Sequence, residues 1–205
     1  MSRLDVVASL LRSTARGAAD KLKALPAASA LQNALRNAAL GRVLVSNAQL
    51  TAAVARALGA REATVTAGSD VLRLDVALAD GGQLALALSL AGAVFAAGGA
   101  KELSFDTDPP EASRTRGARE AVAAIAGELA RALWKPALLR APESGPADFV
   151  ALDGARLVVD LRSVPEVRWA LRQRVPAALI ELLRARKVAF VPEGLCLQLA
   201  FDPRP

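Results

Sequence analysis

The sequence predicts an α+β fold in which a curved antiparallel sheet is packed with long amphipathic helices. Leucines alternate with small or polar residues over Val71–Leu78 and again over 83–90, and this period of two is typical of strands with one apolar face. The turn 79–82 between them contains Asp-Gly-Gly, which favours a hairpin because glycine accepts a positive φ. Apolar residues recur every three or four positions over 4–25 and 111–140, the spacing of amphipathic helices.

The order of elements gives the expected domain organisation. We expect residues 1–42 to form an N-terminal helical segment, with helices over 4–25 and 27–40 separated at Pro26. Residues 43–205 form the α+β domain. The segment 141–146 contains two prolines and one glycine and is the candidate boundary inside that domain.

Two helix starts carry the pattern of a capping box, in which the first and fourth side chains bond each other's backbone N–H groups. Ser46 and Gln49 predict a helix that runs to Leu58 and ends at Gly59. The segment 163–166 (Ser-Val-Pro-Glu) predicts a second helix, which continues to about residue 182 with a kink at Pro176.

Further strands are expected beside the central hairpin. They are 62–66, 103–105, 155–161 and 195–201. Because the strands between 62 and 105 follow one another through short turns, we expect an antiparallel meander in this part of the chain.

The amino-acid composition predicts where in the cell the protein is found. The chain has 205 residues, 53% of them hydrophobic, and one cysteine, Cys196. A single cysteine forms no internal disulfide, and no apolar run reaches the ~18 residues of a membrane-spanning helix. The first residues do not resemble a signal peptide, since Asp5 precedes the short apolar stretch and Arg12 ends it. We therefore expect a cytoplasmic protein, with membrane association as an additional hypothesis.

The residue types argue against catalysis. The chain contains no histidine and no tyrosine, so the commonest general base and the commonest neutral metal ligand are missing. One cysteine is too few for a zinc site of the cysteine type. We expect no enzyme activity, no catalytic residue, no metal and no cofactor.

The net charge of +6 is concentrated in two stretches, 1–42 and 162–187, each with seven Lys or Arg and two Asp or Glu. On the predicted helix 4–25, four basic residues could face an anionic membrane while the leucines insert; they are Arg12, Arg16, Lys21 and Lys23. Alternatively, that helix packs into the core or against a second subunit. Nucleic acid is not expected as a partner, because the aromatic residues that stack on bases make up only 3% of the chain.

The apolar strand face suggests a ligand. Such a face either packs on helices or lines a cavity for a hydrophobic small molecule or lipid. The expected ligand-binding residues are those of the hairpin and of the helix over 111–140: Leu72, Leu74, Leu84, Leu86, Leu88, Val122, Ile125 and Leu129. The alternative is a homodimeric interaction or scaffold module that uses basic helices to bind a protein partner.

The order of elements and the leucine alternation across 43–201 resemble the tubular lipid-binding (TULIP/SMP-like) superfamily, although no diagnostic motif of that superfamily is present. The resemblance implies a sheet wrapped around a helix, and binding or transfer of lipid without catalysis. No site residues follow from it.

Overall fold

The computed structural model describes residues 41–96, 98–138, 149–173, 177, 180, 181 and 183–201. The chain divides into two units, Met1–Arg42 and Val43–Pro205. The predicted helices over 4–25 and 27–40 lie outside the described residues. Apart from Gly41 and Arg42 at the junction, every described residue belongs to the second unit.

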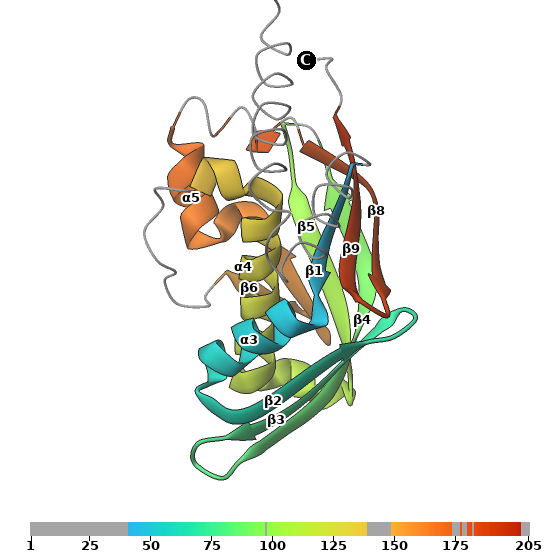
Figure 1. The fold of residues 1–205 in the computed structure, drawn as a ribbon, viewed down its shortest axis with the longest axis vertical. Helices are drawn as coiled ribbons and strands as arrows, with labels where there is room; N and C mark the ends of the chain where they lie inside the picture. The colour runs from blue at the N-terminus through green and yellow to red at the C-terminus, as the bar shows by residue number, and fades with distance from the viewer. Residues whose placement is uncertain are drawn as a thin grey trace, which may run out of the picture. The chain divides into compact units, whose positions relative to one another are not determined.

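Nine strands, three α-helices and two short 3₁₀ helices are described (Figure 1). In chain order they are β1 (Arg42–Ser46), α3 (Asn47–Leu58), β2 (Ala60–Ala67), β3 (Val71–Leu78), β4 (Gln83–Phe95), β5 (Lys101–Asp108), η1 (Pro110–Arg114), α4 (Arg116–Leu138), β6 (Val150–Asp153), β7 (Arg156–Asp160), η2 (Leu161–Ser163), α5 (Pro165–Leu171), β8 (Leu183–Val191) and β9 (Gly194–Phe201).

The strands form two sheets. One has six strands in the order β2-β3-β4-β5-β7-β6, and the other has three in the order β1-β9-β8. All pairings within the larger sheet are antiparallel, as is the pairing of β8 with β9.

The expected architecture, one curved sheet packed with long amphipathic helices, is wrong. Among the described residues 47% lie in strands and 36% in helices, so sheet dominates the fold. The helices have 12, 23 and 7 residues. Within the helix expected over 163–182, α5 ends at Leu171, and the described residues 177, 180 and 181 are again helical. The basic residues beyond this range, Arg184, Arg186 and Lys187, lie in strand β8.

The central hairpin is confirmed. β3 and β4 pair in the register Leu72↔Leu88, Leu74↔Leu86 and Val76↔Leu84, so the leucines of both strands share one face. That face is buried at Leu72, Leu74, Leu86 and Leu88. Beyond Leu90, β4 continues to Phe95, with an irregularity between Leu90 and Gly92 where its register against β5 shifts; the sequence predicts this continuation and a bend at Gly92.

The first capping box is also confirmed. Ser46 caps α3 and accepts a hydrogen bond from the backbone N–H of Gln49, whose side chain accepts one from the backbone N–H of Ser46. Gly59 ends the helix in the left-handed conformation with φ of 58°. This conformation satisfies carbonyl groups of the last turn, because the N–H of Gly59 points back toward Ala55 and Arg56.

The second capping box is wrong. Val164 precedes the first residue of α5, and no side chain caps that helix. Ser163 instead bonds Asp160, while the Glu166 side chain turns toward α4 and accepts a hydrogen bond from Arg131. A tertiary ion pair has therefore replaced the local bond that the sequence pattern predicts.

One hydrophobic core joins the two sheets and the helices. It contains the buried hairpin leucines, the face of α4 formed by Val122, Ile125 and Leu129, and residues of the smaller sheet such as Phe190. The rings of Phe105 and Phe190 lie with centroids 6.4 Å apart, which places β5 against β8 inside this core. No helix in the described part of the chain is long and apolar enough to cross a membrane.

Candidate binding groove between helices α3 and α4

The structure brings the sequence-predicted ligand residues together, in the core. Seven of the eight are buried, namely Leu72, Leu74, Leu86, Leu88, Val122, Ile125 and Leu129. Leu84 is half-buried and lies against Gly117 at the start of α4. Contact of these residues with a ligand stays a prediction. The predicted membrane-facing residues Arg12, Arg16, Lys21 and Lys23 lie outside the described residues.

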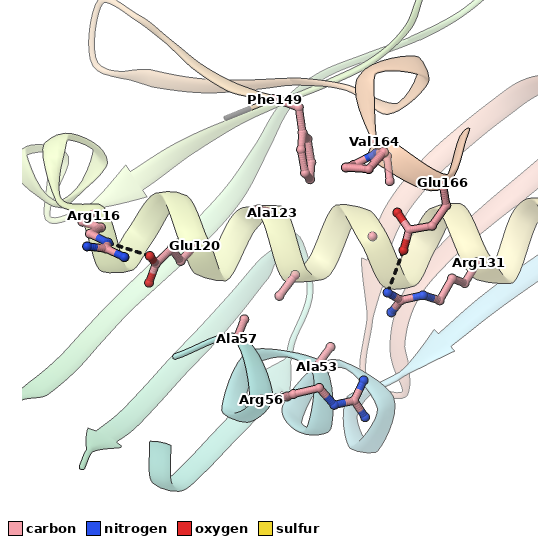
Figure 2. Close-up of a pocket in the computed structure, with 13 residues that line it drawn as sticks. Ala53, Arg56, Ala57, Arg116, Glu120, Ala123, Arg131, Phe149, Val164 and Glu166 are labelled. Atoms are coloured by element: carbon pink, nitrogen blue, oxygen red, sulfur yellow. Dashed lines mark hydrogen bonds and ion pairs between the residues drawn. The ribbon is translucent and has the colours of Figure 1, made fainter. Parts of the chain in front are cut away.

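A groove opens where α4 runs beside α3 and the start of α5 (Figure 2). Its volume is about 360 Å³. We call it the α3–α4 groove, and it is lined by Ala53, Arg56, Ala57, Arg116, Glu120, Ala123, Ala124, Gly127, Arg131, Phe149, Val164, Pro165 and Glu166.

The groove uses the side of α4 that faces away from the strands. Arg116, Glu120, Ala123, Gly127 and Arg131 line it and follow one another at intervals of three or four residues, so they share one helix face. At about 100° per residue, this face lies opposite the apolar stripe that α4 buries in the core. The first and last of these residues are 15 positions apart, which corresponds to about 22 Å along the helix.

The middle of the groove is apolar and built from small side chains. Ala53 and Ala57 of α3 face Ala123 of α4 across it, and Phe149 and Val164 border the far side of α4 (Figure 2). At Gly127 an added Cβ would meet no atom within 4 Å. No neighbouring side chain requires this glycine, although glycine inside a helix costs about 0.5–1 kcal/mol relative to alanine.

One end of the groove carries a partly buried ion-pair network. Arg131 donates to Glu166 at 2.9 Å and to Glu128 at 3.2 Å. Glu166 is only 5% exposed, and a buried carboxylate without a close cation strongly destabilises a fold. Arg131 therefore connects α4 to the start of α5, and its charge is balanced by two carboxylates of the protein itself.

The other end is marked by an exposed ion pair. The Arg116 Nε donates to Glu120 Oε1 at 2.6 Å, and the Arg116 side chain is 89% exposed. The hydrogen bond to Glu120 raises the pKa of the Arg116 guanidinium above its usual value. Since such exposed pairs contribute little to stability, this pair chiefly sets the direction of the Arg116 side chain.

Arg56 is the third arginine of the groove. It lies in the last turn of α3 and is exposed. Unlike Arg116 and Arg131, it forms no ion pair with another residue that the structure describes. Its guanidinium group is therefore exposed to solvent at the edge of an apolar groove.

A second cavity, of about 260 Å³, lies over the ends of β2, β3 and β4. Leu84 is the one predicted ligand residue that lines it, beside polar side chains that include Glu62, Asp75 and Gln83. Its lining is more polar than that of the α3–α4 groove and offers less to a hydrophobic ligand.

Sequence reasoning missed the α3–α4 groove. The signal it had was the second face of the helix over 111–140, where arginines stand at both ends of a run of small residues. Nothing local in the sequence shows that α3 lies along this face, or that Glu166 comes to Arg131 from 35 residues away.

Comparisons of the chain with protein-family models, with curated proteins and with solved structures found no match.

Proposed function

We propose that the protein binds a hydrophobic ligand, such as a lipid or an acyl chain, in the α3–α4 groove without transforming it. The observation that carries this proposal is the open apolar space above Gly127, bordered by Ala53, Ala57 and Ala123 on neighbouring helices. An apolar ligand would fill this space and remove from water the exposed Ala57 and the half-buried Ala124, which is favourable at about 25 cal/mol per Å² of apolar area.

The size of the groove suits a small molecule. Its volume of about 360 Å³ lies at the lower end of the range of roughly 300–1,000 Å³ that is typical of small-molecule sites. Such sites combine a mostly apolar lining with a few placed polar groups. Here the apolar residues occupy the middle, and the arginines and glutamates lie toward the ends (Figure 2).

The chemistry of the lining supports binding rather than catalysis. The two carboxylates that line the groove, Glu120 and Glu166, each accept a hydrogen bond from an arginine, so both are held as ion-pair partners. The sequence offers no histidine or tyrosine to complete an acid–base pair.

The groove differs in position from the ligand site expected from the sequence. The hairpin leucines and the stripe of Val122, Ile125 and Leu129 pack together in the core, whereas the α3–α4 groove lies on the opposite face of α4. A ligand in the groove would leave the core intact, so binding and folding should respond to different substitutions.

Filling the groove tests the proposal. Nile red, a neutral solvatochromic dye, serves as the probe for the full chain, with Gly127→Phe as the blocking variant and Gly127→Ala as its matched control. The phenyl ring would occupy the apolar space and exclude the dye from it. Burying one large apolar group contributes about 1.5–3 kcal/mol, so we expect the affinity for the dye to fall by about tenfold or more. Gly127→Ala should bind within about twofold of the unmodified chain, because it adds a single methyl group.

A second blocking variant tests the proposal independently, in case Gly127→Phe does not fold. Ala57→Phe fills the groove from α3, where position 57 is exposed. Thermal unfolding of each variant establishes that it is folded. If both phenylalanine variants fold and bind the dye as tightly as the unmodified chain, or if the unmodified chain binds no dye, the proposal is wrong.

A further inference from the structure

We infer that the ligand of the α3–α4 groove is an amphiphile with one acyl chain and an anionic head group, and that Arg56 binds the head group. This inference rests on the proposed function and adds the chemical class of the ligand. It starts from the charges of the groove: three arginines, Arg56, Arg116 and Arg131, and two glutamates, Glu120 and Glu166, line it.

The protein already uses two of these arginines. Arg131 bonds Glu166 and Glu128, and Arg116 bonds Glu120. Each of these pairs connects side chains that the fold itself brings together. A ligand carboxylate at either arginine would have to compete with a protein carboxylate that is already at 2.6–3.2 Å.

Arg56 faces no such competition within the described residues. Its side chain lines the groove from α3, and Figure 2 shows it with Arg131 toward one end, while Arg116 lies toward the other. A guanidinium group presents its N–H donors in a planar fork that fits a carboxylate or a phosphate. The head group of a ligand whose chain lies over Gly127 would therefore meet Arg56 at the edge of the groove.

The surroundings strengthen this interaction relative to open solvent. The exposed apolar side chain of Ala57 adjoins Arg56 on the same helix turn, and a bound acyl chain would exclude water from it. Hydrogen bonds between charged partners are about twice as strong as neutral ones. We expect an acid to bind about tenfold more tightly than the alcohol with the same chain.

Competition against Nile red tests the inference with three ligands of twelve carbon atoms each: dodecanoate and dodecyl phosphate, both below their micelle concentrations, and dodecanol, below its solubility limit. The variant is Arg56→Gln, which removes the charge and keeps much of the length. Arg119→Gln is the matched control, because Arg119 is exposed on α4 and does not line the groove. We expect Arg56→Gln to abolish most of the preference for the anionic ligands and to leave the affinity for dodecanol unchanged. Arg119→Gln should change neither the preference nor the affinity for dodecanol.

The outcomes separate this inference from the function on which it rests. Equal affinity of the unmodified chain for acid and alcohol, or an anion preference that survives Arg56→Gln, overturns the inference. Even then, the proposed function would still be supported if the unmodified chain binds dodecanol and Gly127→Phe abolishes this binding. If none of the three ligands displaces the dye, both fail. The tighter of dodecanoate and dodecyl phosphate identifies the head group as a carboxylate or a phosphate.

Discussion

Gly194 lies so close to Val45 that a side chain at position 194 would overlap the carbonyl oxygen of Val45. A Cβ built there would also lie 2.9 Å from the Cα of Ser46, and Gly194 has a φ of +146°, a conformation that favours glycine. This contact brings the start of β9 against β1 and against the residue that caps α3. The smaller sheet thereby positions the N-terminus of the helix that forms one side of the groove.

The first prediction follows from that contact. Gly194→Ala should lower the free energy of unfolding by more than the roughly 1–3 kcal/mol expected of an unfavourable φ alone, because the backbone of β1 must also move. Gly154→Ala is the control, since Gly154 has a φ of +64° but open space around its Cβ position. Urea denaturation measures both. Equal losses for the two variants would show that the close approach to Val45 contributes nothing.

Asn47 provides a second test of how α3 is held. Its Nδ2 donates to the carbonyl of Pro192 at 2.8 Å, and its Oδ1 accepts from the backbone N–H of Ala67 at 3.1 Å. We expect Asn47→Ala to cost about 1–3 kcal/mol, because both backbone groups lose their partner. Asn47→Asp loses the donor to Pro192 but keeps the acceptor and adds a negative charge at the first residue of α3, which interacts favourably with the helix dipole, so it should cost less. Thermal unfolding that ranks the two variants the other way would contradict this account.

The elements that could be predicted from the sequence are those determined by local signals. Ser46 with Gln49 determines the start of α3, and Gly59 its end. Alternating leucines and a glycine turn determine the β3–β4 hairpin. In each case the residues that carry the signal bond or pair within one helix or one hairpin, so no knowledge of the tertiary structure is needed.

The elements that could not be predicted depend on distant partners. In β8 the register against β9 shifts between Ala185 and Lys187, which interrupts the alternation that would have indicated a strand. Glu166 has a capping pattern, yet its bond is to Arg131 on another helix. The α3–α4 groove likewise exists only because two helices separated by four strands come to lie side by side.

The core role of the hairpin leucines gives a third prediction. Leu88→Ala should lower the free energy of unfolding by about 2–5 kcal/mol, the range for removing a fully buried leucine side chain. Leu84→Ala should cost less, because Leu84 is half-buried. Neither variant should weaken Nile red binding while it remains folded, since neither residue lines the α3–α4 groove. Dye affinity that falls together with stability in Leu88→Ala would instead support a ligand site at the leucine face.

Lys101 is the basis of the last prediction. It lies at the start of β5, is fully buried, and donates from Nζ to the carbonyl of Ala96. Burial lowers the pKa of the Lys101 ammonium below its usual value, and the Glu181 carboxylate opposes this effect. Arg162 and Arg184 lower the pKa further, whereas Asp160 raises it.

The sign of the pH dependence follows from this lowered pKa. Between the folded-state pKa and the unfolded value of about 10.5, the unfolded chain binds more protons at Lys101 than the folded chain does, so stability rises with pH across this window. Below the window the protonated amine destabilises the fold by a constant amount, and above it that destabilisation is gone. Lys101→Met removes the titrating group and with it this contribution to the pH dependence.

We therefore expect the unmodified chain to gain stability relative to Lys101→Met as the pH is raised from below the folded-state pKa toward 10.5, and the difference to level off above that value. Urea denaturation at several pH values measures it, and titrations elsewhere in the chain cancel in the comparison. Lys187→Met is the control, because Lys187 is exposed in β8 and its ammonium stays in water in both states. A difference between the unmodified chain and Lys101→Met that stays constant up to pH 10.5 would show that the buried amine does not lose its proton ahead of the unfolded chain.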